Sequence, residues 1–227
     1  MPRRLLAFVL LVTATGSAAA QSAANGALAL ELPAAPRALA LGNTGVALAG
    51  DETAVFYNPA QLGGVRRAAA GLSTQAYIAA SSLHAVAVAL PLGRGTLGLG
   101  LQALDYGDEE EYRCGNPADC QYGEPTGNEI SATDGALTVG YGLAMGRLRV
   151  GAAAKLAYQS VASQSAAAVA ADLGLGLDLT RWLSIGASLR NVGSRLGFDD
   201  RDVPLPRIAR VGLAVPVRLG PGLALTA

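Results

Sequence analysis

The sequence predicts an all-β protein whose antiparallel strands form a transmembrane β-barrel. Three observations predict this fold class. They are an N-terminal export signal, a weakly charged composition without a helix-length apolar stretch, and repeated segments with an apolar residue at every second position. Each observation is weak by itself, because many exported proteins are rich in β-structure. Together they favour a barrel wall, because only helices and closed barrels span a bilayer.

The first 20 residues have the three parts of a signal peptide. Arg3 and Arg4 supply the positive charge, and residues 5–14 form an apolar run that is short for a bilayer span. Ala18-Ala19-Ala20 then precede the polar Gln21, as at a cleavage site. A retained membrane anchor is the alternative, but the small residues favour cleavage. We expect residues 1–20 to be removed on export, with Gln21 as the mature N-terminus.

The composition excludes several classes of protein. Charged residues make up 15% of the chain and hydrophobic residues 51%, which is unusual for a soluble enzyme. Cleavage would remove two of the 17 basic residues and none of the 17 acidic ones, so the mature chain has a net charge near −2. We expect no nucleic-acid partner, because such a protein needs a clustered basic surface. After residue 20 no run of about 18 apolar residues predicts a transmembrane helix.

Eight segments are expected as strands, and a ninth begins near residue 222. They are residues 66–79, 83–91, 95–106, 131–144, 147–160, 165–179, 182–192 and 207–218. In most of them large apolar residues alternate with Gly, Ala, Ser or an isolated charge, which is the period-two pattern of a barrel strand. Short links alternate with longer ones, as periplasmic turns and outer loops do in bacterial barrels.

The strand number indicates an incomplete barrel. Bacterial single-chain barrels have an even number of strands, and this sequence stops soon after the ninth begins. We interpret residues 65–227 as the strands of a C-terminally truncated barrel. The alternative is an eight-stranded barrel that closes alone and leaves a frayed tail.

Six charged residues fall on the face of the strands that we assign to the lumen. Strands 147–160 and 165–179 are neighbours, so unlike charges on them can pair across the sheet. A polar track that guides a ligand head group is the alternative. Trp182 and Tyr141 fall near the periplasmic strand ends, where aromatic girdles occur. The six lumen-facing residues are Arg149, Lys155, Asp172, Asp178, Arg190 and Arg210.

The segment before the first strand carries the most specific pattern. Residues 36–64 read PRALALGNTGVALAGDETAVFYNPAQLGG, with Phe56 and Tyr57 directly before Asn58-Pro59-Ala60. Asn before Pro predicts a turn, because Pro excludes the preceding residue from helical backbone. The stretch resembles the start of the PorV/PorQ family of outer-membrane proteins and, more distantly, the FadL group. Residues 97–142 extend the resemblance to most of the mature chain.

This resemblance implies a FadL-like barrel of about fourteen strands with an N-terminal hatch in the lumen. Residues 21–64 would form the hatch. Asn58-Pro59-Ala60 would turn the chain into the first wall strand, and Phe56 and Tyr57 would pack inside the barrel. The alternative is a periplasmic tail with one turn, but the apolar and glycine-rich sequence of residues 39–50 is unlike a disordered segment.

The sequence contains no catalytic or metal-binding pattern, so we expect neither an enzyme nor a cofactor. His84 is the only histidine, and no serine has the partners of a catalytic triad. Cys114 and Cys120 lie in the longest expected loop, residues 107–130, and we expect a disulfide between them after export. A two-thiol metal site is the alternative. The acidic run 108–111 could bind Ca²⁺ but is commonly just solvated.

Two main functions follow from these expectations, both in the bacterial outer membrane with its lipid as surroundings, and a structural barrel with a periplasmic partner is a third alternative. The PorV/PorQ resemblance implies a component of type IX secretion that handles exported proteins through their C-terminal signal domains. The rival is a FadL-like transporter of long-chain fatty acids or other hydrophobic small molecules, with the N-terminal segment as its gate.

Overall fold

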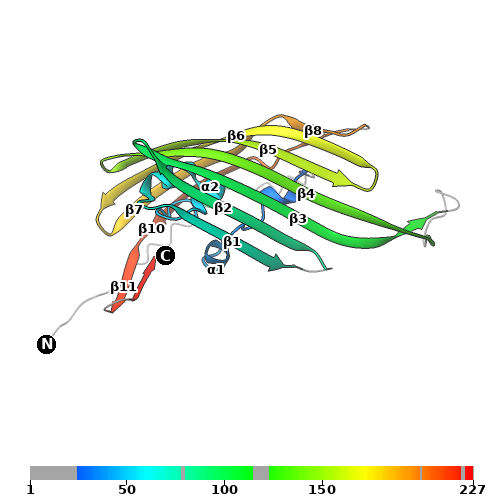
Figure 1. Ribbon diagram of the computed structural model, residues 1–227, viewed down its shortest axis with the longest axis horizontal. Coiled ribbons are helices and arrows are strands. Elements are labelled where there is room, and N and C mark those ends of the chain that lie inside the picture. The colour runs from blue at the N-terminus through cyan, green and yellow to red at the C-terminus, as the bar shows by residue number, and fades with distance from the viewer. Residues whose placement is uncertain (1–24, 78–79, 115–122, 200, 221–222, 227) are drawn as a thin grey trace, which may run out of the picture.

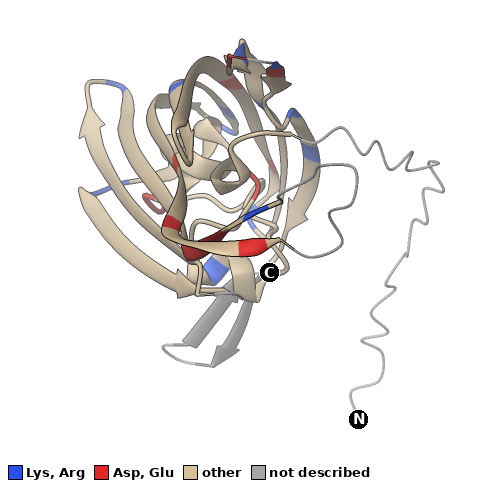
Figure 2. Cartoon of the chain, turned by 90° about the vertical axis from the view of Figure 1, so that its right-hand side faces the viewer, with Lys and Arg blue, Asp and Glu red and all other residues tan. Residues whose placement is uncertain are grey.

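The computed structural model describes residues 25–77, 80–114, 123–199, 201–220 and 223–226 (Figure 1). The expected signal peptide 1–20 and Cys120 lie outside these residues. The described chain is all-β, and its main feature is one curled antiparallel sheet that forms a half-barrel (Figures 1 and 2). The predicted all-β class is confirmed.

The main sheet has eight antiparallel strands that follow one another in chain order. β1 to β7 are joined by direct hairpin connections, and the connection from β7 to β10 contains the small β8–β9 sheet, so the sheet is a meander with one longer connection. The strands lie close to the eight predicted ranges, because the alternation of apolar residues marks both their position and their inner face. They are β1 (Ala69–Ala76), β2 (Ser82–Leu92), β3 (Gly95–Arg113), β4 (Glu124–Met145), β5 (Leu148–Val161), β6 (Gln164–Thr180), β7 (Leu183–Gly193) and β10 (Ile208–Ala214).

The expected loop 107–130 is instead largely a long hairpin. Strands β3 and β4 remain paired as far as Arg113 and Glu124, with register shifts after Asp105 and after Glu110. The hairpin extends beyond the rest of the sheet (Figure 1). The sequence prediction is wrong here because polar residues occupy both faces of this extension, which removes the period-two pattern on which the strand prediction depended.

The last predicted strand, 207–218, is divided in two. β10 pairs with β7 as far as Ala214, and Pro216 then begins β11 (Pro216–Gly220), which pairs with β12 (Leu223–Thr226) in a separate sheet. Pro lacks the N–H that a ladder requires, so a break at this point is expected. A third small sheet joins β8 (Arg195–Gly197) to β9 (Asp202–Pro204), between the expected strands 182–192 and 207–218.

The two faces of the main sheet differ in chemistry as the alternation predicts. The convex face is lined by exposed apolar side chains, such as Leu173 at 59% and Leu175 at 55% exposure on β6. The outward positions of β5 from Leu148 to Tyr158 are all apolar. The concave face carries mainly Gly, Ala and a few buried polar residues. Its covering comes from the chain's own N-terminal segment.

Residues 25–65 lie on the concave side of the half-barrel (Figure 2). Only short helices occur in this segment: η1 (Leu28–Leu30), α1 (Pro36–Ala40), α2 (Ala54–Tyr57) and η2 (Pro59–Gly64). The core lies between segment and sheet. Val55, Phe56 and Leu62 belong to one cluster with alanines of β2, and Leu30 packs in another with alanines of β4, β5 and β6. The small side chains of the sheet leave room for the segment.

Candidate functional site

The Asn58-Pro59-Ala60 turn is the point where the N-terminal segment is held to the sheet. Asn58 is fully buried and has an extended backbone, as a residue before Pro must. Its side-chain oxygen accepts from the Ala60 N–H at 3.1 Å and so caps η2. Its Nδ2 donates to the carbonyls of Val46 at 2.7 Å and Leu175 at 3.0 Å. One side chain therefore joins a loop, a helix start and strand β6.

Phe56 and Tyr57 are buried beside this turn, as are Pro59 and Ala60. The Tyr57 hydroxyl accepts from the Ala35 N–H at 3.2 Å, and its ring faces the Arg190 guanidinium at 5.9 Å. Burial raises the pKa of Tyr57, so the hydroxyl remains protonated. The aromatic pair thus belongs to the packed core of the segment.

A row of glycines in the sheet lies under the turn. Gly142 pairs with Gly151, and Gly151 pairs with Gly174, so the row crosses β4, β5 and β6. A Cβ on Gly151 would overlap the backbone of Pro59 and Ala60, and a Cβ on Gly174 would overlap the Asn58 side chain. We call these three residues the glycine row. Its lack of side chains is what allows η2 to lie directly on the strands.

The predicted ion pairs between β5 and β6 are confirmed. Arg149 makes two bonds to the Asp178 carboxylate, at 2.5 and 2.7 Å. Lys155 and Asp172 are 2.8 Å apart and both side chains are fully enclosed. Enclosed charges cannot line an open path for a ligand head group, so the polar-track alternative does not apply to this pair. Arg149 also donates to Gln61 of η2 at 2.9 Å and so links the sheet to the segment.

Arg190 and Arg210 bind the backbone of the segment instead of a carboxylate. Arg190 donates to the Leu30 carbonyl at 2.7 Å, and Arg210 donates to the Asn43 carbonyl at 2.9 Å. All six charged residues expected on the inner face therefore bond to the segment, to one another or to a neighbouring inner side chain. Charge pattern alone does not reveal these acceptors, because main-chain carbonyls occur at every residue.

Sequence reasoning missed further residues of the same kind. Gln102 donates to the Ala29 carbonyl at 2.7 Å, and Asp134 accepts from the Ala29 N–H at 3.3 Å and from Tyr106 at 2.9 Å. Ser73 and Gln75 of β1 donate to the carbonyls of Ala34 and Pro33. The available signal was a polar residue isolated among small ones on the inner face.

The remaining candidates lie away from the turn. Cys114 takes part in a disulfide, and its predicted pairing with Cys120 stays a prediction. His84 is exposed and contacts Thr74 and Ser82. Within the acidic run, Glu111 accepts from Arg113, Thr126 and Asn128. Among the described residues no three His, Cys, Asp or Glu side chains gather as a metal site.

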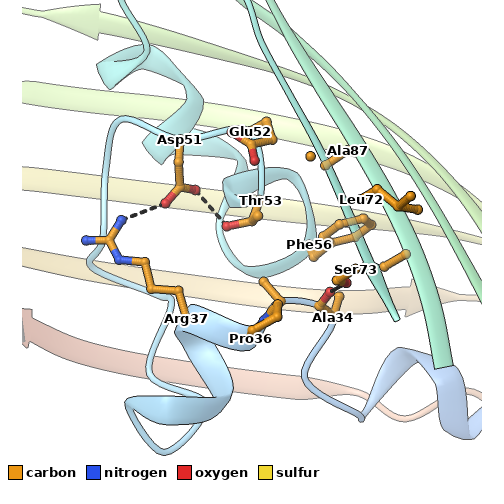
Figure 3. A pocket seen from close by; sticks show the side chains of 13 residues that line it. Ala34, Pro36, Arg37, Asp51, Glu52, Thr53, Phe56, Leu72, Ser73 and Ala87 are labelled. Carbon is orange, nitrogen blue, oxygen red and sulfur yellow. Dashed lines mark hydrogen bonds and ion pairs between the residues drawn. The ribbon is translucent and has the colours of Figure 1, made fainter. Parts of the chain in front are cut away.

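A cavity of about 210 Å³ lies between the segment and strands β1 and β2 (Figure 3). Phe56, Leu72 and Ala87 supply apolar walls. Arg37 and Asp51 form an ion pair of 2.8 Å at its border. The volume is below the roughly 300 Å³ at which pockets for drug-sized ligands begin. This cavity accepts a short apolar group but not a long alkyl chain.

Two larger hollows lie elsewhere. One of about 580 Å³ is on the convex face, lined by residues such as Leu173, Leu189 and Val211. The other, about 590 Å³, lies between the β5–β6 turn and the β8–β9 hairpin and is lined by both apolar and polar groups, including Gln159 and Phe198.

Comparisons of the chain with protein-family models, with curated proteins and with solved structures found no match. In the part of the chain that the structure describes, no helix is long and apolar enough to cross a membrane.

The glycine row predicts a steric effect of single methyl groups. Gly151→Ala places a Cβ against the backbone of η2, which cannot move without losing the Asn58 contacts. We expect a loss of about 1–3 kcal/mol in the free energy of unfolding, measured by urea titration. Gly135→Ala is the matched control on β4, since its Cβ would have only the Gln102 carbonyl within 4 Å, at 3.9 Å. Equal stability of the two variants would refute the close packing of η2.

Asn58→Asp tests the role of the Asn58 amide. The substitution keeps the shape but removes the Nδ2 donor and points a carboxylate oxygen at the Val46 and Leu175 carbonyls. We expect the free energy of unfolding to fall by about 3 kcal/mol or more, because Asn58 is fully buried. The readout is the protection of residues 25–65 from protease. The control is Asn128→Asp, at an exposed position. A variant as protected as the wild type would show that Asn58 does not fasten the segment.

Proposed function

We propose that this protein is an outer-membrane β-barrel protein of the PorV/PorQ type, with residues 21–64 as a luminal plug. In this role it serves type IX secretion and receives exported proteins through their C-terminal signal domains. The observation that carries the proposal is the combination of an apolar band on the convex face with a concave face filled by the chain's own N-terminal segment.

The convex face has the chemistry and the height of a lipid-facing band. Along β5, Leu148 to Tyr158 spans about 34 Å at roughly 3.4 Å per residue, or about 25 Å at the 45° tilt of barrel strands. This is the height of the apolar band of outer-membrane barrels. In water, such a continuous apolar surface would drive aggregation.

The edges of the half-barrel are consistent with a larger barrel. β1 and β10 are the first and last strands of the eight-stranded sheet and do not pair with each other. In a bilayer their free N–H and C=O groups must be paired, since lipid offers no hydrogen bonds. Further strands, from the same polypeptide or from another chain, therefore complete the proposed barrel.

The firm attachment of the segment favours protein handling over small-molecule transport. The segment is joined to the sheet by Asn58, Arg149, Arg190 and other buried polar groups, and η2 lies directly on the glycine row. A gate must open at low cost, whereas this segment loses many buried hydrogen bonds if it leaves. A fixed plug keeps the lumen closed and leaves the barrel mouth and the β3–β4 hairpin as binding surfaces.

A FadL-like transporter remains the second candidate because of the 590 Å³ hollow beside Phe198. Its size is within the range of ligand pockets, and it has both apolar and polar groups. In that case a hydrophobic small molecule binds at this end before it passes the segment.

A pull-down from detergent-solubilised outer membrane, with mass spectrometry of proteins and lipids, distinguishes the two functions. Under the proposal we expect secretion components and proteins that share a C-terminal signal domain. Recovery of fatty acids or other apolar molecules without a protein partner would support the transporter instead.

Plug function predicts that removing the segment changes conductance, whereas tethering it does not. Deletion of residues 26–56 is expected to raise the conductance of the protein in planar bilayers. The Ser73 hydroxyl donates to the Ala34 carbonyl, so these two positions are close. A disulfide between cysteines placed there is expected to leave conductance and secretion unchanged. The reduced form of the same variant is one control, and wild-type protein treated with the same reductant is the second, because reduction also opens the disulfide of Cys114. Loss of activity on oxidation alone would mean that the segment moves as a gate.

A further inference from the structure

Each of the two-residue turns at one end of the sheet contains an arginine. They are Gly93-Arg94 between β2 and β3, Gly146-Arg147 between β4 and β5, and Arg181-Trp182 between β6 and β7. The two glycines have φ of 62° and 64°, so the turn conformation itself accounts for them but not for the arginines. The turn at the opposite end, residues 162–163 between β5 and β6, carries no charge.

The start of β1 adds two arginines at the same end. Ala69 pairs with Ala89, so Arg66 and Arg67 lie near the end of β2 that leads into the Arg94 turn. We call the five residues Arg66, Arg67, Arg94, Arg147 and Arg181 the arginine collar. They come from four separate places in the sequence, and the meander of the sheet brings them to one end.

The collar is exposed and is not neutralised by the described part of the chain. All five residues are exposed, and none forms an ion pair with a described carboxylate. Arg147 donates only to the Leu179 carbonyl, at 3.4 Å. The nearby Asp178 carboxylate accepts from Arg149 and Ser184. The guanidinium groups are therefore free to bind an external anion.

Amphipathic and apolar residues lie immediately beside the collar. Trp182 follows Arg181 and is 56% exposed, and the Tyr141 hydroxyl donates to the Leu92 carbonyl next to the Arg94 turn. Leu92, Met145 and Leu148 are exposed at the same ends of their strands. Aromatic residues of this kind occupy the head-group level of a bilayer. In the proposed membrane location, the collar lies just beyond the apolar band, at the depth of lipid phosphates.

We infer that the arginine collar binds the phosphate groups of anionic phospholipids in the leaflet that the short turns reach. The inference rests on the proposed membrane location of the protein. Guanidinium groups form paired hydrogen bonds to phosphate oxygens, and each basic residue near an anionic leaflet strengthens attraction about fivefold. The opposite end is acidic along the β3–β4 hairpin, at Asp105 and residues 108–111 (Figure 2), and repels such lipids.

Trp182 provides the test, because it is the only tryptophan of the chain and lies next to Arg181. The protein is reconstituted in phosphatidylcholine vesicles that contain either phosphatidylglycerol with brominated acyl chains or brominated phosphatidylcholine. Bromine quenches tryptophan fluorescence at short range, so the ratio of quenching gives the preference for the anionic lipid. We expect wild-type protein to prefer phosphatidylglycerol at least tenfold, and the triple variant R94Q/R147Q/R181Q to lose that preference.

The triple variant R113Q/R195Q/R201Q is the matched control. It removes the same charge from exposed arginines at the opposite end and is expected to keep the lipid preference within twofold. The collar is overturned if both variants lose the preference for phosphatidylglycerol equally, or if the collar variant keeps it. In both of these outcomes Trp182 is still quenched by lipid. Absence of quenching by both brominated lipids places Trp182 outside the bilayer and overturns the collar, whereas protein that does not stay with the vesicles overturns the proposed membrane location itself.

Discussion

The close contact between the Asn58-Pro59-Ala60 turn and the glycine row is the constraint on which the rest of the structure depends. Buried polar groups and alanines surround this contact, and the half-barrel curls around it. Any side chain at Gly151 or Gly174 would displace η2 and with it Asn58. The abundance of glycine in strands, which by itself weakens a sheet, is thus explained by the segment that the sheet must accommodate.

The buried charges follow from the same arrangement. Once the concave face is covered, water cannot solvate Arg149, Lys155 or Arg190, so each needs a partner inside the protein. Arg149 and Lys155 have acidic partners on the next strand, and Arg190 binds the segment's backbone. The contacts of Arg149 to Gln61 and of Arg190 to Leu30 specify where the segment lies. The ion pairs themselves add little stability, because desolvation offsets much of the gain from a buried ion pair.

The parts of the fold that could be predicted from sequence were those governed by a local period. Alternation located the eight strands of the sheet and their two faces, and the order of strands placed Arg149 and Lys155 beside acidic partners. The β3–β4 extension has no such period. The division at Pro216 depends on whether a neighbouring strand needs the N–H that Pro lacks, which the local sequence does not tell. The site was predicted only as a turn with an aromatic pair. The Asn58 contact to Leu175 spans 117 positions in the chain and leaves no local signal.

The sheet holds the first half of the segment mainly through carbonyl oxygens of the main chain. Leu30, Ala29, Ala34, Pro33 and Asn43 each accept a hydrogen bond from a strand side chain through a group that every amino acid carries. These hydrogen bonds therefore recognise the path of the chain and not the identity of its side chains. Apart from core residues such as Leu30, residues 29–43 are free to diverge in sequence as long as they follow the same path and stay small, while Asn58 and the glycine row are not.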